Sequence, residues 1–265
     1  MKKILATAAV LVALFPATGA AQRDPLLTRP GLEVGVQAAD YRYVEPGLMK
    51  LSGERGGVFG AYTFTNDTRG LFSRIDVRES YGWLKYDGTG TKSGVPDWII
   101  EARAVVGADF LPGSGVSLSP YVGLGYRFLY NDLRGYGSTG AVGYRRYSNY
   151  LYEPVGLTAR IDLGDGLIFA PTMEVDIFLR GRQESRLSDT GLGFVNVTNR
   201  QDRGRGHRIY LMFERDHWAI GAWTHYWHIM DSDSQFAGVV GGITRFGREP
   251  ENTTRESGLE LRYRF

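Results

Sequence analysis

Apolar and polar residues alternate along most of this chain. From Leu167 to Leu179 every odd position is apolar, whereas the even positions include Thr172, Glu174 and Asp176. A period of two sorts side chains onto the two faces of an extended strand, whereas a helix would scatter them around its axis. The pattern therefore predicts strands.

Ten segments carry this alternation, and the connections between them are of two kinds. Short connections follow the second, fourth, sixth and eighth segments, and longer ones rich in Gly, Ser, Thr, Asp and Arg follow the others. The expected strands are 31–44, 55–66, 70–86, 96–110, 115–130, 146–163, 167–181, 204–216, 217–230 and 254–265. The expected long loops are 45–54, 87–95, 131–145, 182–203 and 231–253. Short turns at one end, long loops at the other and an even strand count are typical of an outer-membrane β-barrel.

Three observations favour a lipid-facing apolar surface over the buried core of a soluble barrel. The charged face is rich in Arg and poor in Lys, which suits paired charges in a narrow lumen. The chain ends in an alternating apolar pattern with an aromatic last residue, which we interpret as a barrel assembly signal: Leu259, Leu261, Tyr263 and Phe265. Aromatic residues also lie near strand ends, as in interfacial girdles: Trp83, Trp98, Tyr126, Tyr130, Trp218, Tyr226, Tyr263 and Phe265. The fold class is thus all-β, a closed antiparallel transmembrane barrel of about ten strands.

The first 21 residues have the pattern of a secretory signal peptide. Lys2 and Lys3 precede an apolar run at 4–15, and small residues follow Pro16. We therefore expect a signal peptide at 1–21 and one barrel domain at 22–265, placed in the bacterial outer membrane with both termini in the periplasm. No later stretch reaches the roughly 18 apolar residues that a spanning helix needs.

Composition excludes several kinds of chemistry. The chain has no Cys, so disulfides, zinc–thiolate sites, thiol catalysis and a lipidated Cys are excluded. Without Lys2 and Lys3 the formal charges balance, which argues against a nucleic-acid partner. The sequence predicts no cofactor and no metal.

The inward faces of the expected strands carry similar numbers of acids and bases. The acids are Glu33, Asp76, Glu101, Asp109, Asp162, Glu174, Asp176, Glu214 and Glu260, and the bases are Arg74, Arg78, Arg103, Arg127, Arg160, Arg180, Arg208, Arg262 and Arg264. The lumen of so small a barrel is only slightly wider than one that side chains fill. We therefore predict a network of ion pairs that plugs the lumen, with a narrow porin-like channel as the alternative. Glu79 and Glu153 fall on the apolar face, which a position above the bilayer or a bulge would explain.

Candidate chemistry lies at the rim of the ninth strand. His225 and His228 are three residues apart, so they face opposite sides and cannot share a metal. His228, Asp231 and Asp233, with Ser232 or Ser234 nearby, are weak candidates for a hydrolase site. A second cluster of Arg203, Arg205, His207 and Arg208 could contact anionic lipopolysaccharide.

The layout resembles the omptin-type proteases, which are ten-stranded outer-membrane barrels of similar length. The resemblance implies a pair of acids and an Asp–His pair that face each other at the outer rim. Asp97 lies at the outer end of the fourth expected strand, but Val95 stands where its partner acid is needed, and Gly191 stands where a His would follow Asp189. No catalytic residue is carried over, and the sequence favours a non-enzymatic protein while leaving enzyme activity open.

The sequence therefore predicts an outer-membrane barrel with a charge-plugged lumen and a structural, surface-interaction or adhesion role through its extracellular loops. The alternatives are a narrow channel for small solutes and an omptin-like or lipid-modifying hydrolase at the rim. Expected partners are outer-membrane lipid, lipopolysaccharide and, through the last strand, the barrel assembly machinery; the extracellular ligand is undefined.

Overall fold

The computed structural model describes residues 24–66 and 70–265, and the expected signal peptide lies outside these residues. Within them, ten long strands close into one antiparallel barrel, which confirms the predicted fold class. These strands are β1 (Gly31–Glu45), β2 (Met49–Asn66), β3 (Leu71–Asp87), β4 (Thr91–Ala108), β6 (Val116–Tyr136), β7 (Val142–Asp162), β8 (Leu167–Ser185), β10 (Gly204–Arg215), β11 (Trp218–Ile229) and β14 (Asn252–Arg264).

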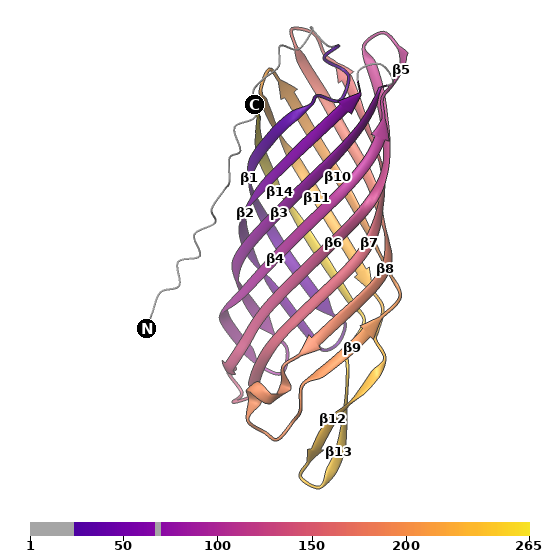
Figure 1. The fold of residues 1–265 in the computed structure, drawn as a ribbon. Helices are drawn as coiled ribbons and strands as arrows, with labels where there is room; N and C mark the ends of the chain where they lie inside the picture. Colours follow the sequence, from indigo (N-terminus) through magenta and orange to yellow (C-terminus); the bar gives the residue numbers. More distant parts are fainter. Residues whose placement is uncertain (1–23, 67–69) are drawn as a thin grey trace.

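The barrel closes where β1 pairs with β14, from Glu33 opposite Arg264 to Val44 opposite Thr253. Shorter elements extend its two ends: β5 (Phe110–Gly113), the 3₁₀ helix η1 (Leu187–Thr190), β9 (Val197–Gln201), β12 (Ser234–Val240) and β13 (Ile243–Arg248). In Figure 1 the C-terminus and β5 lie at the upper end, and β9 and the β12–β13 hairpin lie at the lower end. We call these the turn end and the loop end. No helix of the described residues is long and apolar enough to cross a membrane.

Three connections expected to be long loops are tight turns. Residues 46–48, 88–90 and 137–141 form these turns, because β2, β4, β6 and β7 extend four to six residues past their expected ends. Gly47 and Gly140 adopt φ values of 73° and 80°, which a side chain would disfavour. The other two expected loops remain the longest connections, and they contain η1 with β9 and the β12–β13 hairpin.

Several strands are longer than the sequence predicts, because the apolar face changes from the outside to the inside of the barrel along their length. On β1, Val36 points outward and is 56% exposed, whereas Glu33 is buried inside. Further along the same strand, Tyr41 and Tyr43 are buried inside and Arg42 is exposed outside. The apolar face is thus outside near the turn end and inside near the loop end. A lipid surrounding for the first part and water for the second explains this inversion.

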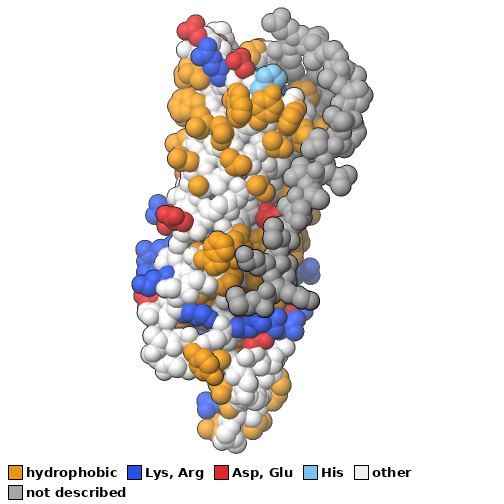
Figure 2. Space-filling view, turned by 90° about the vertical axis from the view of Figure 1, so that its left-hand side faces the viewer, with side chains coloured by type: hydrophobic (Ala, Val, Ile, Leu, Met, Phe, Trp, Pro, Cys, Tyr) orange, Lys and Arg blue, Asp and Glu red, His pale blue; other side chains and the backbone are white. Residues whose placement is uncertain are grey.

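An apolar belt therefore surrounds the turn half of the barrel. Figure 2 shows hydrophobic side chains over the upper part and charged side chains gathering lower down. Exposed members of the belt include Ile75, Val77, Met173, Val175, Leu211, Ile220, Leu259 and Leu261. Five of the expected girdle aromatics are also exposed: Trp83, Tyr126, Trp218, Tyr226 and Phe265.

Glu79 and Glu153, the two acids that the alternation places on the apolar face, both lie on the outer face and are half-buried. Glu79 accepts a hydrogen bond from Nε1 of Trp98 at 3.1 Å, so a girdle indole partners its carboxylate. Along β7, which carries Glu153, inward and outward side chains alternate without interruption. No bulge therefore turns either acid inward.

The belt predicts where an added charge is costly. Val36→Arg should destabilise the barrel in a bilayer by about 2–4 kcal/mol, because it places a guanidinium among lipid tails. Asp40→Arg, on the same face of β1 beyond the belt, should change stability by less than about 1 kcal/mol. Urea unfolding in phospholipid vesicles measures both, and equal losses would contradict the position of the belt.

Candidate functional site: the closed lumen and the loop end

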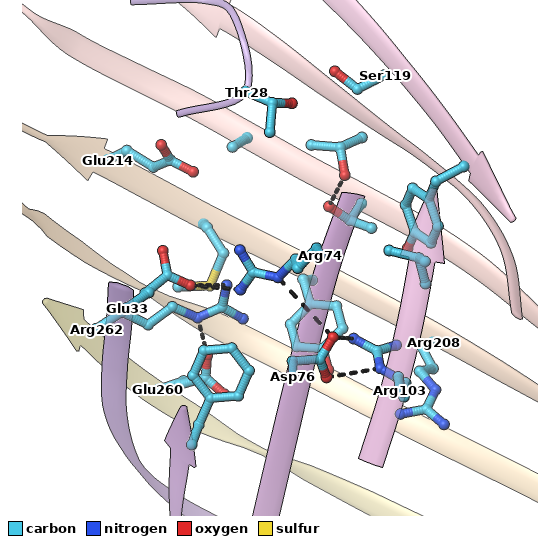
Figure 3. A pocket seen from close by; sticks show the side chains of 18 of the residues that line it. Thr28, Glu33, Arg74, Asp76, Arg103, Ser119, Arg208, Glu214, Glu260 and Arg262 are labelled. Carbon is cyan, nitrogen blue, oxygen red and sulfur yellow. Dashed lines mark hydrogen bonds and ion pairs between the residues drawn. The ribbon is translucent and has the colours of Figure 1, made fainter. Parts of the chain in front are cut away.

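Arginines and carboxylates from opposite walls meet in the middle of the lumen. The guanidinium of Arg103 bridges Asp76 at 2.9 Å and Glu174 at 2.8 Å. Arg208 reaches Glu101 at 2.5 Å and Asp176 at 2.7 Å. The pair of Arg103 with Asp76 joins the neighbouring strands β4 and β3 (Figure 3). The pairs of Arg103 with Glu174 and of Arg208 with Glu101 join β4 to β8 and β10, which are not its neighbours in the sheet.

A second cluster lies closer to the turn end. Glu33 accepts from Arg74 at 2.7 Å and from Arg264 at 2.6 Å, and Arg262 lies 3.4 Å away. Arg262 also pairs with Glu260 on its own strand. A cavity of about 110 Å³ remains between the two clusters, lined by these charged groups (Figure 3).

Hydroxyl groups complete the network at the turn end. Thr28 and Ser119 donate to Asp109 at 2.7 and 2.6 Å. Arg160 donates to the same two hydroxyl oxygens at 3.3 and 3.1 Å. Glu214 lies 3.7 Å from Arg264. The segment before β1 thus enters the mouth of the barrel.

Two of the expected lumen charges lie outside the network. Asp162 is exposed and accepts from the backbone N–H of Gly164 in the adjoining turn. Arg180 is exposed because the pairing of β7 with β8 shifts between Leu151 and Tyr152, and the extra residue on β8 reverses the alternation. Counting odd and even positions along a strand does not predict such a bulge.

The structure also adds lumen charges that the sequence interpretation missed. Glu256 pairs with Arg78 at 3.1 Å and with Arg127 at 3.0 Å, and all three are buried. Arg55 pairs with the fully buried Asp97.

The odd–even alternation of their strands places both of these acids, Glu256 and Asp97, on the inner face. Glu256 shares its inward face with Glu260, and Asp97 shares its face with Glu101. Both were available from the alternation alone. The position of Asp97 at the start of the expected strand 96–110 predicts a rim residue, whereas β4 begins at Thr91 and places Asp97 inside the wall.

Aromatic and aliphatic side chains close the lumen on the loop side of the charges. Tyr41, Tyr152 and Trp227 are at most 2% exposed, and Leu51, Leu84, Val95, Ile99, Leu129 and Ile229 belong to the same cluster. The indole of Trp227 contacts the guanidinium groups of Arg127 and Arg208, 5.6 and 5.8 Å from its ring centroid. Among the described residues, the buried apolar layer therefore packs directly against the buried charges.

A third charged cluster is buried at the loop end. Arg146 pairs with Glu45 at 2.6 Å and with Glu249, and the hydroxyl of Tyr43 donates to both carboxylates at 2.8 and 3.1 Å. Burial raises the pKa of Glu249 to about 7, which the charge of Arg146 opposes and that of Glu45 reinforces. The backbone of Glu249 accepts from the N–H of Ser232 at 3.0 Å, so this cluster fixes the base of the β12–β13 hairpin.

The rim candidates do not form a common site. His228 pairs with Glu251 at 2.6 Å, and Asp231 pairs with Arg248 at 2.9 Å. Asp233 accepts from a backbone N–H of β9 at 2.7 Å. The three side chains thus have separate partners.

The nearby hydroxyl and imidazole groups are engaged elsewhere. Ser232 donates to a backbone carbonyl at 2.7 Å. His225 is buried inside and hydrogen-bonds the hydroxyl of Tyr210, whereas His228 faces outward, so the prediction that they face opposite sides is confirmed. The described residues contain no group of three His, Asp or Glu suited to a metal.

Comparison with known proteins shows the same fold. The outer-membrane protease OmpT of Escherichia coli superposes with a TM-score of 0.57, with 10% identity, over 89% of this chain and 97% of that protein. The translocator domain of the autotransporter NalP from Neisseria meningitidis matches at a TM-score of 0.41, with 14% identity, over 90% of each chain. No family model and no curated protein matches the sequence. At 10% identity, the likeness to OmpT shows the fold of an outer-membrane β-barrel and nothing finer.

The two acids compared with the protease pattern have other partners here. Asp97 lies inside the wall with Arg55, and Asn131 donates to it. Asp189, in η1, pairs with Arg145 at 2.7 Å, and this hydrogen bond lowers the pKa of the aspartate to about 2. Neither acid is an unengaged carboxylate.

The lumen network predicts a contrast between two arginines that the sequence alternation places on the inner face, Arg103 and Arg180. Arg103→Ala should cost about 3–5 kcal/mol of stability, because Asp76 and Glu174 lose a buried partner. Arg180→Ala should stay within about 0.5 kcal/mol, since that side chain is exposed. Unfolding in vesicles tests the pair, and a small loss for Arg103→Ala would contradict a tightly coupled network.

The loop-end cluster predicts a pH dependence. A carboxyl group with a pKa raised from about 4.5 to about 7 holds its proton better in the docked state, so docking weakens as pH rises through this window. Amide exchange at Ser232 and Glu249, corrected for intrinsic rates, should indicate opening roughly tenfold or more frequent at pH 8 than at pH 5. Glu249→Gln should remove this difference, and an unchanged pH dependence in that variant would exclude Glu249 as its source.

Proposed function

We propose that this protein resides in the bacterial outer membrane as a closed barrel and acts as a surface-contact protein through its loop end. The packed lumen and the loop end of the barrel differ in a way that supports this function. The lumen is filled by ion pairs and then by aromatic side chains, whereas the segments at the loop end present exposed apolar and basic residues. Transport through the lumen would require both packed layers to separate, so contact at the outer end is favoured over a channel.

The orientation we propose places the turn end and both termini in the periplasm. Leu259, Leu261 and Phe265 are 66%, 40% and 64% exposed on the outer face of β14. An accessible apolar face on the last strand supports its recognition by the barrel assembly machinery. The loop end then lies outside the cell.

An arginine-rich groove on the outer wall supports the same orientation. Arg180, Arg182, Arg186 and Arg200 line a depression of about 950 Å³ together with Tyr126, Phe128 and Tyr147. Leu179, directly before Arg180, is 44% exposed and belongs to the belt. A basic groove at the edge of the belt suits the phosphates of lipopolysaccharide in the outer leaflet.

The cluster expected from sequence to contact lipopolysaccharide is only partly on the surface. Arg203, Arg205 and His207 are exposed, whereas Arg208 faces the lumen. The groove is therefore the better candidate for this contact.

Charge reversal in the groove tests the lipopolysaccharide contact. Arg182→Glu with Arg200→Glu should abolish most of the thermal stabilisation that added lipopolysaccharide gives the refolded barrel. Arg42→Glu with Arg255→Glu, an exposed pair on β1 and β14, provides a matched control. Equal losses in both double variants would show a nonspecific charge effect.

Replacing the loop-end hairpin tests the surface-contact function. Exchanging residues 234–248 for two glycines should leave a folded barrel at the cell surface and reduce adherence of the bacteria to glass and to cultured epithelial cells. Exchanging residues 46–48 for Gly-Ser-Gly at the same end is the control. Unchanged adherence of the hairpin variant would argue against the function.

A further inference from the structure

The β12–β13 hairpin has an unusual composition for a segment beyond the barrel. Residues 234–248 contain two arginines, Arg245 and Arg248, and no Asp or Glu. Its strands meet at Gly241 and Gly242, with φ values of 61° and 78°, so a tight turn forms the tip. The hairpin is therefore narrow and has no acid of its own, and its two arginines differ, because Arg248 at the base pairs with Asp231 at 2.9 Å.

Large apolar side chains stand out from this hairpin. Phe236, Val239, Ile243 and Phe246 are 51%, 58%, 55% and 66% exposed, and the two phenylalanine rings pack edge to face at 6.3 Å. These exposures match those of the belt, where Met173 is 66% exposed. Apolar residues exposed together in this way mark an interaction surface.

The hairpin is held at its base by hydrogen bonds. Asn199 on β9 donates to the carbonyl groups of Asp233 and Gly247 at 2.8 and 3.0 Å. The N–H of Val195 donates to the carbonyl of Ala237 at 3.0 Å. The tip therefore projects from an anchored base, beyond the end of the barrel (Figure 1).

A polar zone separates this apolar tip from the belt. Outward positions between them include the exposed residues Asp40, Arg42 and Glu54. Figure 2 shows charged side chains between the hydrophobic upper part and the hydrophobic group at the lowest end. The lipid around the belt therefore does not account for the exposed tip.

We propose that the hairpin inserts its tip into a second, anionic lipid surface that faces the outer end of the barrel. The paired phenylalanines and the two aliphatic residues would enter the acyl region, and Arg245 would contact anionic headgroups, whereas Arg248 keeps its ion pair with Asp231 at 2.9 Å. The absence of acids from residues 234–248 favours a negatively charged lipid surface over a partner with basic groups. This inference rests on the proposed function, because it requires the loop end to face outward.

A single engineered cysteine makes insertion measurable, since the chain has none. The full barrel with Val239→Cys, labelled with an environment-sensitive dye and held in a nanodisc of neutral lipid, is mixed with vesicles. Vesicles of phosphatidylcholine and phosphatidylglycerol should raise and blue-shift the dye emission, and vesicles of phosphatidylcholine alone should do so much less.

Variants define which side chains carry the contact. Phe236→Ser with Phe246→Ser should lower binding to the anionic vesicles at least about tenfold. Leu48→Ser with Tyr136→Ser removes two other exposed apolar side chains at the loop end and should leave binding unchanged. A similar loss in both double variants would overturn the proposal.

Other occupants give different results. A dye response that grows with protein concentration without vesicles would assign the tip to a second copy and overturn the proposal. No response to either vesicle, with adherence still lost on hairpin replacement, would overturn lipid insertion and leave the surface-contact function standing. Vesicle binding without any effect of the hairpin on adherence would support insertion and reject that function.

Discussion

Closure of the sheet between β1 and β14 requires that charged side chains inside the barrel pair with one another. Once the first and last strands pair, the wall is continuous, and inward charges are removed from bulk water. A buried charge without a partner is costly, so Arg103 and Arg208 must find carboxylates inside the barrel. The crossing ion pairs are therefore a consequence of closure, and they in turn connect walls that share no backbone hydrogen bonds.

The strands extend from a lipid surrounding into water, and the polarity of their inner and outer faces changes accordingly. Near the turn end, apolar residues face outward and charges face inward. Near the loop end, Tyr41, Leu84 and Trp227 fill the interior and polar residues cover the outside. The second half is built as a soluble barrel would be, which gives the loop end a rigid support. A rigid support lets the β12–β13 hairpin hold exposed side chains away from the belt.

The alternation of residues was sufficient to predict the barrel, the ten strands and most lumen charges, because a period of two reports directly on which wall a residue faces. It failed for Arg180, where a bulge reverses the faces, and for the loop-end strands, where the polarity inverts. The cluster of Glu45, Arg146 and Glu249 was beyond prediction, because its members belong to segments expected to be loops or to a strand end. Their proximity depends on how far β1, β7 and the hairpin extend.

Ion pairs and aromatic packing close the lumen in series. The most direct test is the current across a planar bilayer that contains the refolded protein, with folding verified by its heat-dependent shift in electrophoretic mobility. The structure predicts that the membrane stays silent at moderate voltages. Steady, reproducible single-channel steps from the folded barrel would contradict a closed lumen and make the protein a narrow channel.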